Sequence, residues 1–193
     1  MISRCSEKVT NWLIRSEVIK QEDYDLYYYA SYSLILTIFP IGMSFIVGKL
    51  MGVTINALLL ILPFVVIRKY SGGYHAKNSK VCMFFSVVIL VAFTRLSSLI
   101  IWNSYFKLVV LIATISLSML SPIDSINKKL TLDEKRKYKK ITMCLLGLLL
   151  LLIFVFARLH MQQTAVCVSL GIILSASLQI PCLIVKILEK NQN

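Results

Sequence analysis

One stretch of the chain, residues 68–82, holds the two side chains that a thiol-dependent enzyme uses. It reads RKYSGGYHAKNSKVC and contains His75, one of only two histidines in the sequence. It ends on Cys82, where a long apolar run begins. A thiolate is a good nucleophile, and an imidazole can take up and return a proton near neutral pH. The stretch therefore indicates a nucleophile with its general base.

The spacing limits how these two side chains can meet. In one continuous helix, His75 and Cys82 would lie two turns apart, about 10.5 Å along the axis. A catalytic hydrogen bond needs roughly 3 to 3.5 Å, so the chain has to bend between them. Asn78 or Ser79 can cap the helix that follows, which places Cys82 in its first turn. Free backbone N–H groups and the positive end of the helix dipole favour a thiolate there.

Each residue also has a plainer interpretation. A single cysteine at the start of an apolar helix is commonly a small apolar side chain, and a single histidine in a basic loop is commonly solvated. Their occurrence together within one short basic stretch favours the catalytic interpretation.

The elements that must position this stretch are membrane helices. The chain has 193 residues, of which 58% are hydrophobic and 16% charged, and its mean hydropathy is +0.77. A soluble domain is roughly 25% charged. We expect an all-α integral membrane protein with a bundle of about six transmembrane helices, some possible as re-entrant or half-spanning segments. The apolar runs lie at about 30–47, 53–67, 81–101, 105–121, 141–158 and 164–185.

The basic residues alternate between the connections of such a bundle. Most of the 21 lysines and arginines lie in residues 4–20, 68–80, 128–140 and 186–190. The opposite connections hold Lys49, Lys107 and Arg158. The positive-inside rule then predicts that both termini and the His75–Cys82 stretch lie on the cytoplasmic side of the membrane. The net charge of +12 is explained by basic residues that set the orientation of the protein in the membrane, so we expect no nucleic-acid partner.

We expect a single transmembrane domain over residues 1–193. Residues 1–29 form an amphipathic cytoplasmic segment, which lies flat on the inner membrane surface or packs on the cytoplasmic face of the bundle. Residues 68–80 form the catalytic loop, and residues 122–140 form a basic cytoplasmic loop. The five cysteines are odd in number and form no CxxC pair. A disulfide framework, a metal site and a cofactor are therefore not expected.

The stretch RKYSGGYHAKNSKVC resembles the signature of the accessory gene regulator B (AgrB) family. Its members are membrane cysteine endopeptidases of Gram-positive bacteria that process the precursors of cyclic quorum-sensing peptides. The match includes Arg68, Gly72, Gly73, His75 and Cys82, with the family's seven-residue gap between histidine and cysteine. Residues 121–130, SPIDSINKKL, resemble the family's Pro-x-Asp…Asn-Lys segment more loosely.

The resemblance implies a mechanism and a partner. Cys82 would cleave an AgrD-like precursor peptide, with His75 as general base and then general acid, and would hold the product as a thioester. A cysteine or serine of the precursor would then close a thiolactone or lactone ring. The resemblance also implies a homodimer in the bacterial cell membrane, where membrane lipids surround it.

Several further residues acquire supporting roles from this resemblance. Arg68 would steady the acidic tail of the precursor or the oxyanion, and Gly73 would serve backbone geometry. Asp124 could orient His75, or it could pair with Lys128 or cap a helix. The basic residues between positions 128 and 140 resemble a docking surface for an acidic precursor tail, and anionic lipids are an equally good ligand for them. They are Lys128, Lys129, Lys135, Arg136, Lys137, Lys139 and Lys140.

Two other functions stay open from the residues alone. The chain could be a small membrane transporter or peptide exporter that uses Arg95 in its pathway, with Cys82 incidental. It could also be a non-catalytic membrane partner that binds acidic peptides or lipids through residues 122–140. Replacing Cys82 separates these functions, because only the peptidase should lose all activity.

Overall fold

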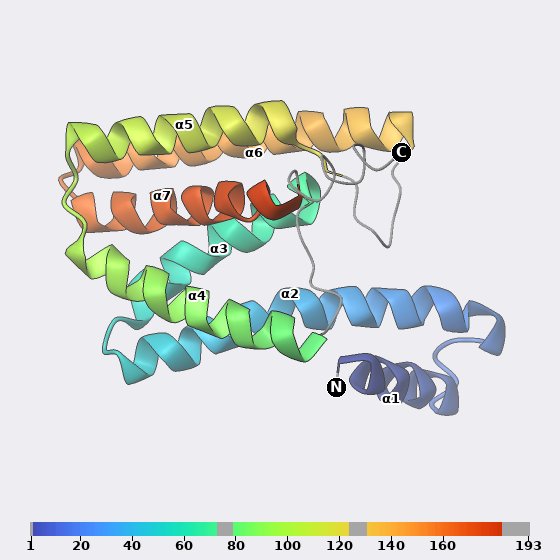
Figure 1. Cartoon of the computed structure of the whole chain (residues 1–193). Coiled ribbons are helices and arrows are strands. Elements are labelled where there is room, and N and C mark those ends of the chain that lie inside the picture. Colours follow the sequence, from blue (N-terminus) through green and yellow to red (C-terminus); the bar gives the residue numbers. More distant parts are fainter. Residues whose placement is uncertain (1, 73–78, 124–130, 183–193) are drawn as a thin grey trace. The chain divides into compact units, whose positions relative to one another are not determined.

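The protein is all-α in the residues that its computed structural model describes, which are 2–72, 79–123 and 131–182. These ranges contain seven α-helices and one 3-10 helix, and no strand. The helices are α1 (Ile2–Arg15), α2 (Tyr24–Leu50), α3 (Thr54–Ser71), α4 (Ser79–Leu99), α5 (Ser104–Leu120), α6 (Leu132–Arg158) and α7 (Gln162–Ser177), and the 3-10 helix is η1 (Gln21–Asp23) (Figure 1). The expected all-α class is confirmed for these residues.

Each of the six predicted apolar runs overlaps one helix, from α2 to α7. Four segments are long and apolar enough to cross a membrane, namely Gln21–Leu50, Thr54–Ser71, Leu132–Arg158 and Gln162–Cys182. The apolar parts of the other two helices, Phe84–Leu99 and Ser104–Leu120, are shorter. These helices fit a protein of the cell membrane, and the count of six spans stays a prediction.

Two compact units make up the chain, residues 1–43 and residues 44–193. The first unit contains α1, η1 and most of α2. Trp12 of α1 is 63% exposed, whereas Ser6 and Thr10 are fully buried. The rings of Tyr24 and Tyr28 stack one helical turn apart, with centroids separated by 6.1 Å. Residues 2–15 are thus helical, and their position on the membrane surface stays a prediction.

The helices that flank the two basic connections are longer than the apolar runs. Helix α3 continues to Ser71, and α6 begins at Leu132, so parts of residues 68–80 and 122–140 are helical rather than loop. A capping box starts α6: the hydroxyl of Thr131 accepts a hydrogen bond from the N–H of Glu134, and the Glu134 carboxylate accepts one from the N–H of Thr131. These two bonds satisfy backbone donors that a helix start otherwise leaves unpaired.

Helix α7 forms the centre of the second unit. Every residue from Ala165 to Ala176 is buried except Ile173. A helix that is apolar on all sides is stable only where neighbours surround it, and α7 packs against α3, α5, α6 and α4. Figure 1 shows α5, α6 and α7 running side by side while α3 crosses them at an angle. Leu60 and Ile67 of α3 are fully buried in this core.

The outer faces of α5 and α6 are apolar and exposed. Their large exposed side chains include Leu108, Leu111, Ile112, Ile115 and Met119 of α5, and Leu148, Leu151 and Phe154 of α6. Soluble proteins rarely expose an apolar surface of this extent, whereas a lipid bilayer solvates it. The exposed surface therefore agrees with the composition in indicating a membrane environment.

The backbones of α7 and α3 approach each other closely at Gly171. A Cβ atom at this position would lie 2.5 Å from the carbonyl oxygen of Leu60 and 3.0 Å from the Cβ of Pro63, both in α3. Small residues at such crossings let membrane helices pack backbone to backbone. Gly147 of α6 is also helical, but nothing lies within 4 Å of the position that its Cβ would take.

We expect Gly171→Ala to lower the free energy of unfolding by about 1–3 kcal/mol, because the added methyl group separates α3 from α7. The matched variant Gly147→Ala should be neutral or slightly stabilising, since alanine is the better helix former by about 0.5–1 kcal/mol. Thermal unfolding of the purified protein in detergent, followed by size-exclusion fluorescence, measures both. Equal midpoints for the two variants would contradict the assigned contact.

Candidate active site

Helices α3, α5 and α7 end, and α6 begins, at the same end of residues 44–193 (Figure 1). The N–H of Ile123, just after α5, donates a hydrogen bond to the carbonyl oxygen of Ser71, at 3.0 Å. The rings of Tyr70 and Tyr138 meet edge to face, with centroids 6.0 Å apart, and connect α3 with α6. This end therefore gathers the residues that flank both segments that the sequence motifs singled out.

Gly72 ends α3 and lies against the segment that follows α5. Its φ of +73° and ψ of −162° lie in a region that essentially only glycine adopts. A Cβ at Gly72 would also collide with the carbonyl oxygen of Ile123. Gly72 is therefore required both by its own backbone conformation and by the close approach of Ile123. This contact holds together the two chain positions from which Gly73 and Asp124 continue.

A second hydrogen bond fixes the same segment from the side of α7. The side-chain Nε2 of Gln179 donates to the hydroxyl oxygen of Ser121 at 2.9 Å, and both residues are buried. Ser121 is joined to Pro122 by a cis peptide bond. The segment 121–123 thus has contacts with the ends of both α3 and α7. Gln179 belongs to none of the motifs identified in the sequence.

The described residues include only some of the expected site residues. His75, Gly73, Asp124, Lys128 and Lys129 lie outside the described residues. Helix α4 begins at Ser79, so Cys82 lies in its first turn, as the sequence predicts. The His75–Cys82 distance and the role of each residue remain predictions.

Helix α4 packs on the bundle through its second half. Leu90, Thr94 and Ser97 are buried, and Nε2 of Gln163 in α7 donates to the carbonyl oxygen of Ser97 at 2.6 Å. Phe84, near the beginning of α4, is 68% exposed. Figure 1 shows that the beginning of α4 lies apart from the ends of α3 and α5. The described residues therefore bring residues 68–72 to residues 121–123, but they do not bring the first turn of α4 to either.

Arg68 lies in the last turn of α3, close to Gly72. Its guanidinium lies 5.7 Å from the ring centroid of Phe64, within the range of a cation–π contact. Lys69 is exposed, and its ammonium lies 5.8 Å from the ring centroid of Tyr70. Cations in the last turn of a helix also interact favourably with the helix dipole. Both cations thus sit at the end that carries the Gly72–Ile123 contact.

The first turns of α6 carry the densest positive charge at this end. In Figure 1, α6 extends beyond the ends of α5 and α7. Its exposed cations are Arg136, Lys137, Lys139 and Lys140, and Lys135 is half-buried. Lys107 and Arg158 lie at the opposite end of the helices, near the start of α5 and the end of α6. The two ends therefore differ in charge as the sequence predicts, whereas the assignment of the basic end to the cytoplasm stays a prediction.

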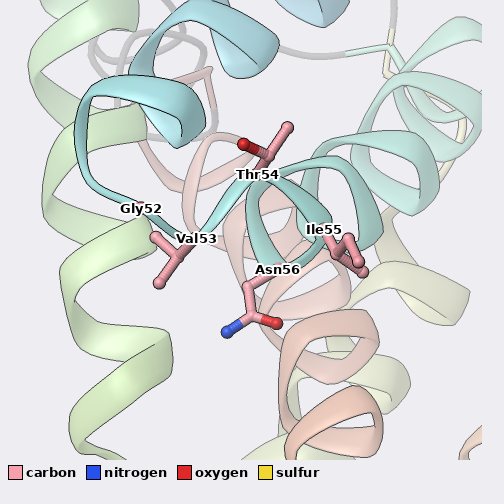
Figure 2. Close-up of a pocket in the computed structure, with 5 residues that line it drawn as sticks. All are labelled: Gly52, Val53, Thr54, Ile55 and Asn56. Carbon is pink, nitrogen blue, oxygen red and sulfur yellow. The ribbon is translucent and has the colours of Figure 1, made fainter.

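A separate hollow lies at the turn between α2 and α3. It has a volume of about 400 Å³ and is lined by Gly52, Val53, Thr54, Ile55 and Asn56 (Figure 2). None of these side chains titrates, and the turn lies at the start of α3, away from Gly72. This hollow therefore offers neither a nucleophile nor a base. Within the described ranges, no group of three or more His, Cys, Asp or Glu side chains could hold a metal ion.

Comparison with known proteins gives one consistent family. The model of the family described as accessory gene regulator B matches residues 6–183. An AgrB-like protein of Clostridium perfringens is 28% identical over 141 residues, which cover 66% of this chain and 66% of the relative. The accessory gene regulator protein B of Staphylococcus saprophyticus is 35% identical over 127 residues, or 62% of each chain. The matches thus span slightly less than two thirds of these relatives' own lengths. No solved structure matches the chain.

We expect Gly72→Ala to break the contact between the two segments, because alanine resists this backbone conformation and its Cβ meets Ile123. Amide hydrogen exchange in residues 121–123, measured by mass spectrometry in detergent, should become about tenfold faster or more, as the loss of a buried hydrogen bond worth roughly 1–3 kcal/mol implies.

The matched control is Gly52→Ala. Gly52 also has a positive φ, +71°, but nothing lies within 4 Å of the position of its Cβ. This variant bears the cost of the backbone conformation alone, about 1–2 kcal/mol, and should leave exchange in residues 121–123 unchanged. Faster exchange there in both variants would show that the effect is general destabilisation.

Proposed function

The chain belongs to the accessory gene regulator B family, and we propose on this basis that it is a membrane cysteine endopeptidase that cleaves a quorum-sensing pro-peptide and promotes its cyclisation. The observation that carries the proposal is the His75–Cys82 motif, with Cys82 in the first turn of α4. Membership of this family supports a role in the accessory gene regulator (agr) quorum-sensing system, with an AgrD-like peptide as the proposed substrate.

Cleavage begins at the thiol of Cys82. His75 takes the thiol proton, and the sulfur attacks the carbonyl carbon of the scissile peptide bond. The tetrahedral intermediate then collapses: the C–N bond breaks, and His75 returns the proton to the leaving amine. The C-terminal part of the precursor departs, and the N-terminal part stays on Cys82 as a thioester. The N-terminal end of α4 supports the thiolate at the start of this sequence.

Cyclisation exchanges this thioester for a ring. A cysteine thiol of the bound precursor loses its proton to His75 and attacks the thioester carbonyl, and the thiolate of Cys82 leaves and is reprotonated. With a serine in place of the cysteine, the product is a lactone. Exchange between two thioesters is nearly neutral in free energy, whereas forming a thioester from an amide is uphill. Release of the cleaved tail therefore draws the first step forward, and a partly dry site slows competing hydrolysis.

Other residues at the basic end assist in this proposal. Asp124 directly follows Ile123 in the sequence, and Ile123 contacts Gly72; in this proposal Asp124 orients the imidazole of His75. Arg68 steadies the acidic tail or the oxyanion. The cations at the start of α6, together with Lys128 and Lys129, attract the acidic tail and anionic lipids. This end faces the cytoplasm, and the enzyme acts as a homodimer.

A transporter without peptidase chemistry is the alternative. It would rely on Arg95, which is exposed on α4 four residues before the helix ends. An arginine this near a helix end can extend its guanidinium to the membrane surface, so its presence needs no role in transport.

We expect a covalent adduct on Cys82 when the protein is co-expressed with a candidate precursor from a neighbouring small reading frame. Intact mass of the purified protein should show the added mass of the N-terminal precursor fragment. Neutral hydroxylamine should remove this mass, because it cleaves thioesters.

Cys82→Ala should show no adduct, and Cys144→Ala, which removes an exposed cysteine of α6, should keep it. His75→Gln should form the adduct at least 100-fold more slowly, as loss of a general base implies, typically 10²–10⁴-fold. Equal precursor cleavage by wild type and Cys82→Ala, with no adduct on either, would sink the peptidase proposal in favour of the transporter.

The basic start of α6 generates a second prediction. Arg136→Gln with Lys137→Gln should raise KM for the precursor without changing kcat, by about two- to fivefold per cation, as exposed ion pairs of roughly 0.5–1 kcal/mol imply. The salt dependence of KM should weaken as well.

Lys107→Gln is the matched control, because this cation lies at the opposite end of the bundle. Its KM should equal that of the wild type in proteoliposomes whose orientation has been checked. A KM that rises equally in both variants would show that net charge, rather than a docking surface, determines affinity.

A further inference from the structure

A fully buried glutamine lies just beyond the end of α7. Gln179 has no exposed surface, and its Nε2 donates to the hydroxyl of Ser121, 58 residues earlier in the chain. Ser121 is itself only 4% exposed. A buried hydrogen bond of this kind, shielded from water, holds two elements in one relative position.

This bond continues into a second one at the end of α3. Ser121 lies two residues before Ile123, whose N–H donates to the carbonyl oxygen of Ser71, and Ile123 also packs against Gly72. A connected path therefore runs from α7 through residues 121–123 to the end of α3. The two chain segments that leave this path are residues 73–78, which contain His75, and residues 124–130, which contain Asp124.

The other half of the Gln179 amide is left unpaired. Its Oε1 is buried and has no hydrogen-bond partner in the described part of the chain. Burying an amide oxygen without a partner is unfavourable, whereas a methionine of similar length would fill the same space without that cost. Packing alone therefore does not explain a glutamine at this position, but the bond to Ser121 does.

We infer that Gln179 is a positioning residue for the peptidase: it holds residues 121–123 against the end of α3 and thereby fixes where the segments of Asp124 and His75 begin. The catalytic part of this inference rests on the proposed function. Gln179 itself touches neither substrate nor nucleophile in this role, because it acts through Ser121.

The same helix provides a matched control. Gln163, near the start of α7, also donates its Nε2 to another helix, to the carbonyl oxygen of Ser97 in α4. Its bond lies at the opposite end of α7 from Gln179. Gln179→Met and Gln163→Met thus make the same chemical change and remove one bond between elements each, but only the first touches the path to residues 121–123.

The experiment measures structure and catalysis on the same full-length preparations in proteoliposomes. Amide hydrogen exchange reports on the N–H groups of Ser121 and Ile123, since Pro122 has none, and steady-state cleavage of added precursor peptide at a series of concentrations gives kcat and KM. Gln179→Met should speed exchange in residues 121–123 about tenfold and lower kcat about tenfold, with KM within twofold. Gln163→Met should leave all three values within twofold of the wild type, even if its thermal midpoint falls.

A second pair of variants keeps the test decisive if Gln179→Met folds poorly. Ser121→Ala should lower kcat as much as Gln179→Met does. Ser121→Thr retains the hydroxyl and should keep the kcat of the wild type. The double variant Gln179→Met/Ser121→Ala should have a kcat no lower than that of either single variant, because both substitutions remove the same bond.

Unchanged exchange in residues 121–123 would overturn the anchoring role, whatever the cleavage rate. Faster exchange with unchanged kcat would overturn the positioning role. If the wild type neither cleaves the precursor nor forms the hydroxylamine-sensitive adduct, the proposed function fails and the catalytic part of the inference falls with it, while the exchange data still decide whether Gln179 anchors the segment.

Discussion

The close approach of α7 to α3 at Gly171 is the contact on which the second unit depends. Lipid solvates apolar side chains as well as a protein core does, so membrane helices associate through close packing and polar contacts rather than through burial from water. At Gly171 the backbone of α7 lies directly against Leu60 and Pro63. This contact seats a helix that is buried on nearly all sides, and α3, α5 and α6 then pack around it. Because α7 is packed against α3 in this way, the end of α7 lies where Gln179 can bond Ser121 and where Ile123 can bond Ser71.

The sequence predicts most of the helices because their signals are local. Long apolar runs identify α2 to α7, and Asn78 or Ser79 as the cap of the following helix correctly predicts that Cys82 lies in the first turn of α4. Residues 131–134, TLDE, have the spacing of a capping box, a local signal that marks the start of α6, with Thr131 as the N-cap and Glu134 as its partner. The contacts of Ile123 with Ser71 and Gly72 join residues about fifty positions apart. No periodicity or propensity encodes such pairs, so the sequence could mark these segments by motif but could not predict that they touch.

Some features of the candidate site also follow from local sequence, and others depend on long-range contacts. The first turn of α4 supplies Cys82 with the positive end of a helix dipole, and this follows from residues 78–82 alone. The frame that holds residues 121–123 needs α3, α5 and α7 together, and Gln179 stands outside every motif in the chain. A candidate nucleophile can thus be recognised from its neighbours in the sequence, whereas the contacts that hold residues 121–123 become visible only in the folded chain.

The cations at the start of α6 are carried by a helix rather than by a loop, and this fixes their angular distribution. With about 100° of rotation per residue, Lys135, Arg136, Lys137, Lys139 and Lys140 spread over an arc of about 200° around the axis. Tyr138 points to the remaining side, where its ring meets Tyr70 of α3. An arc wider than half the circumference presents charge in two opposed directions at once. If these cations bind lipid headgroups and an acidic peptide as proposed, the two ligands would not need to compete for the same lysines.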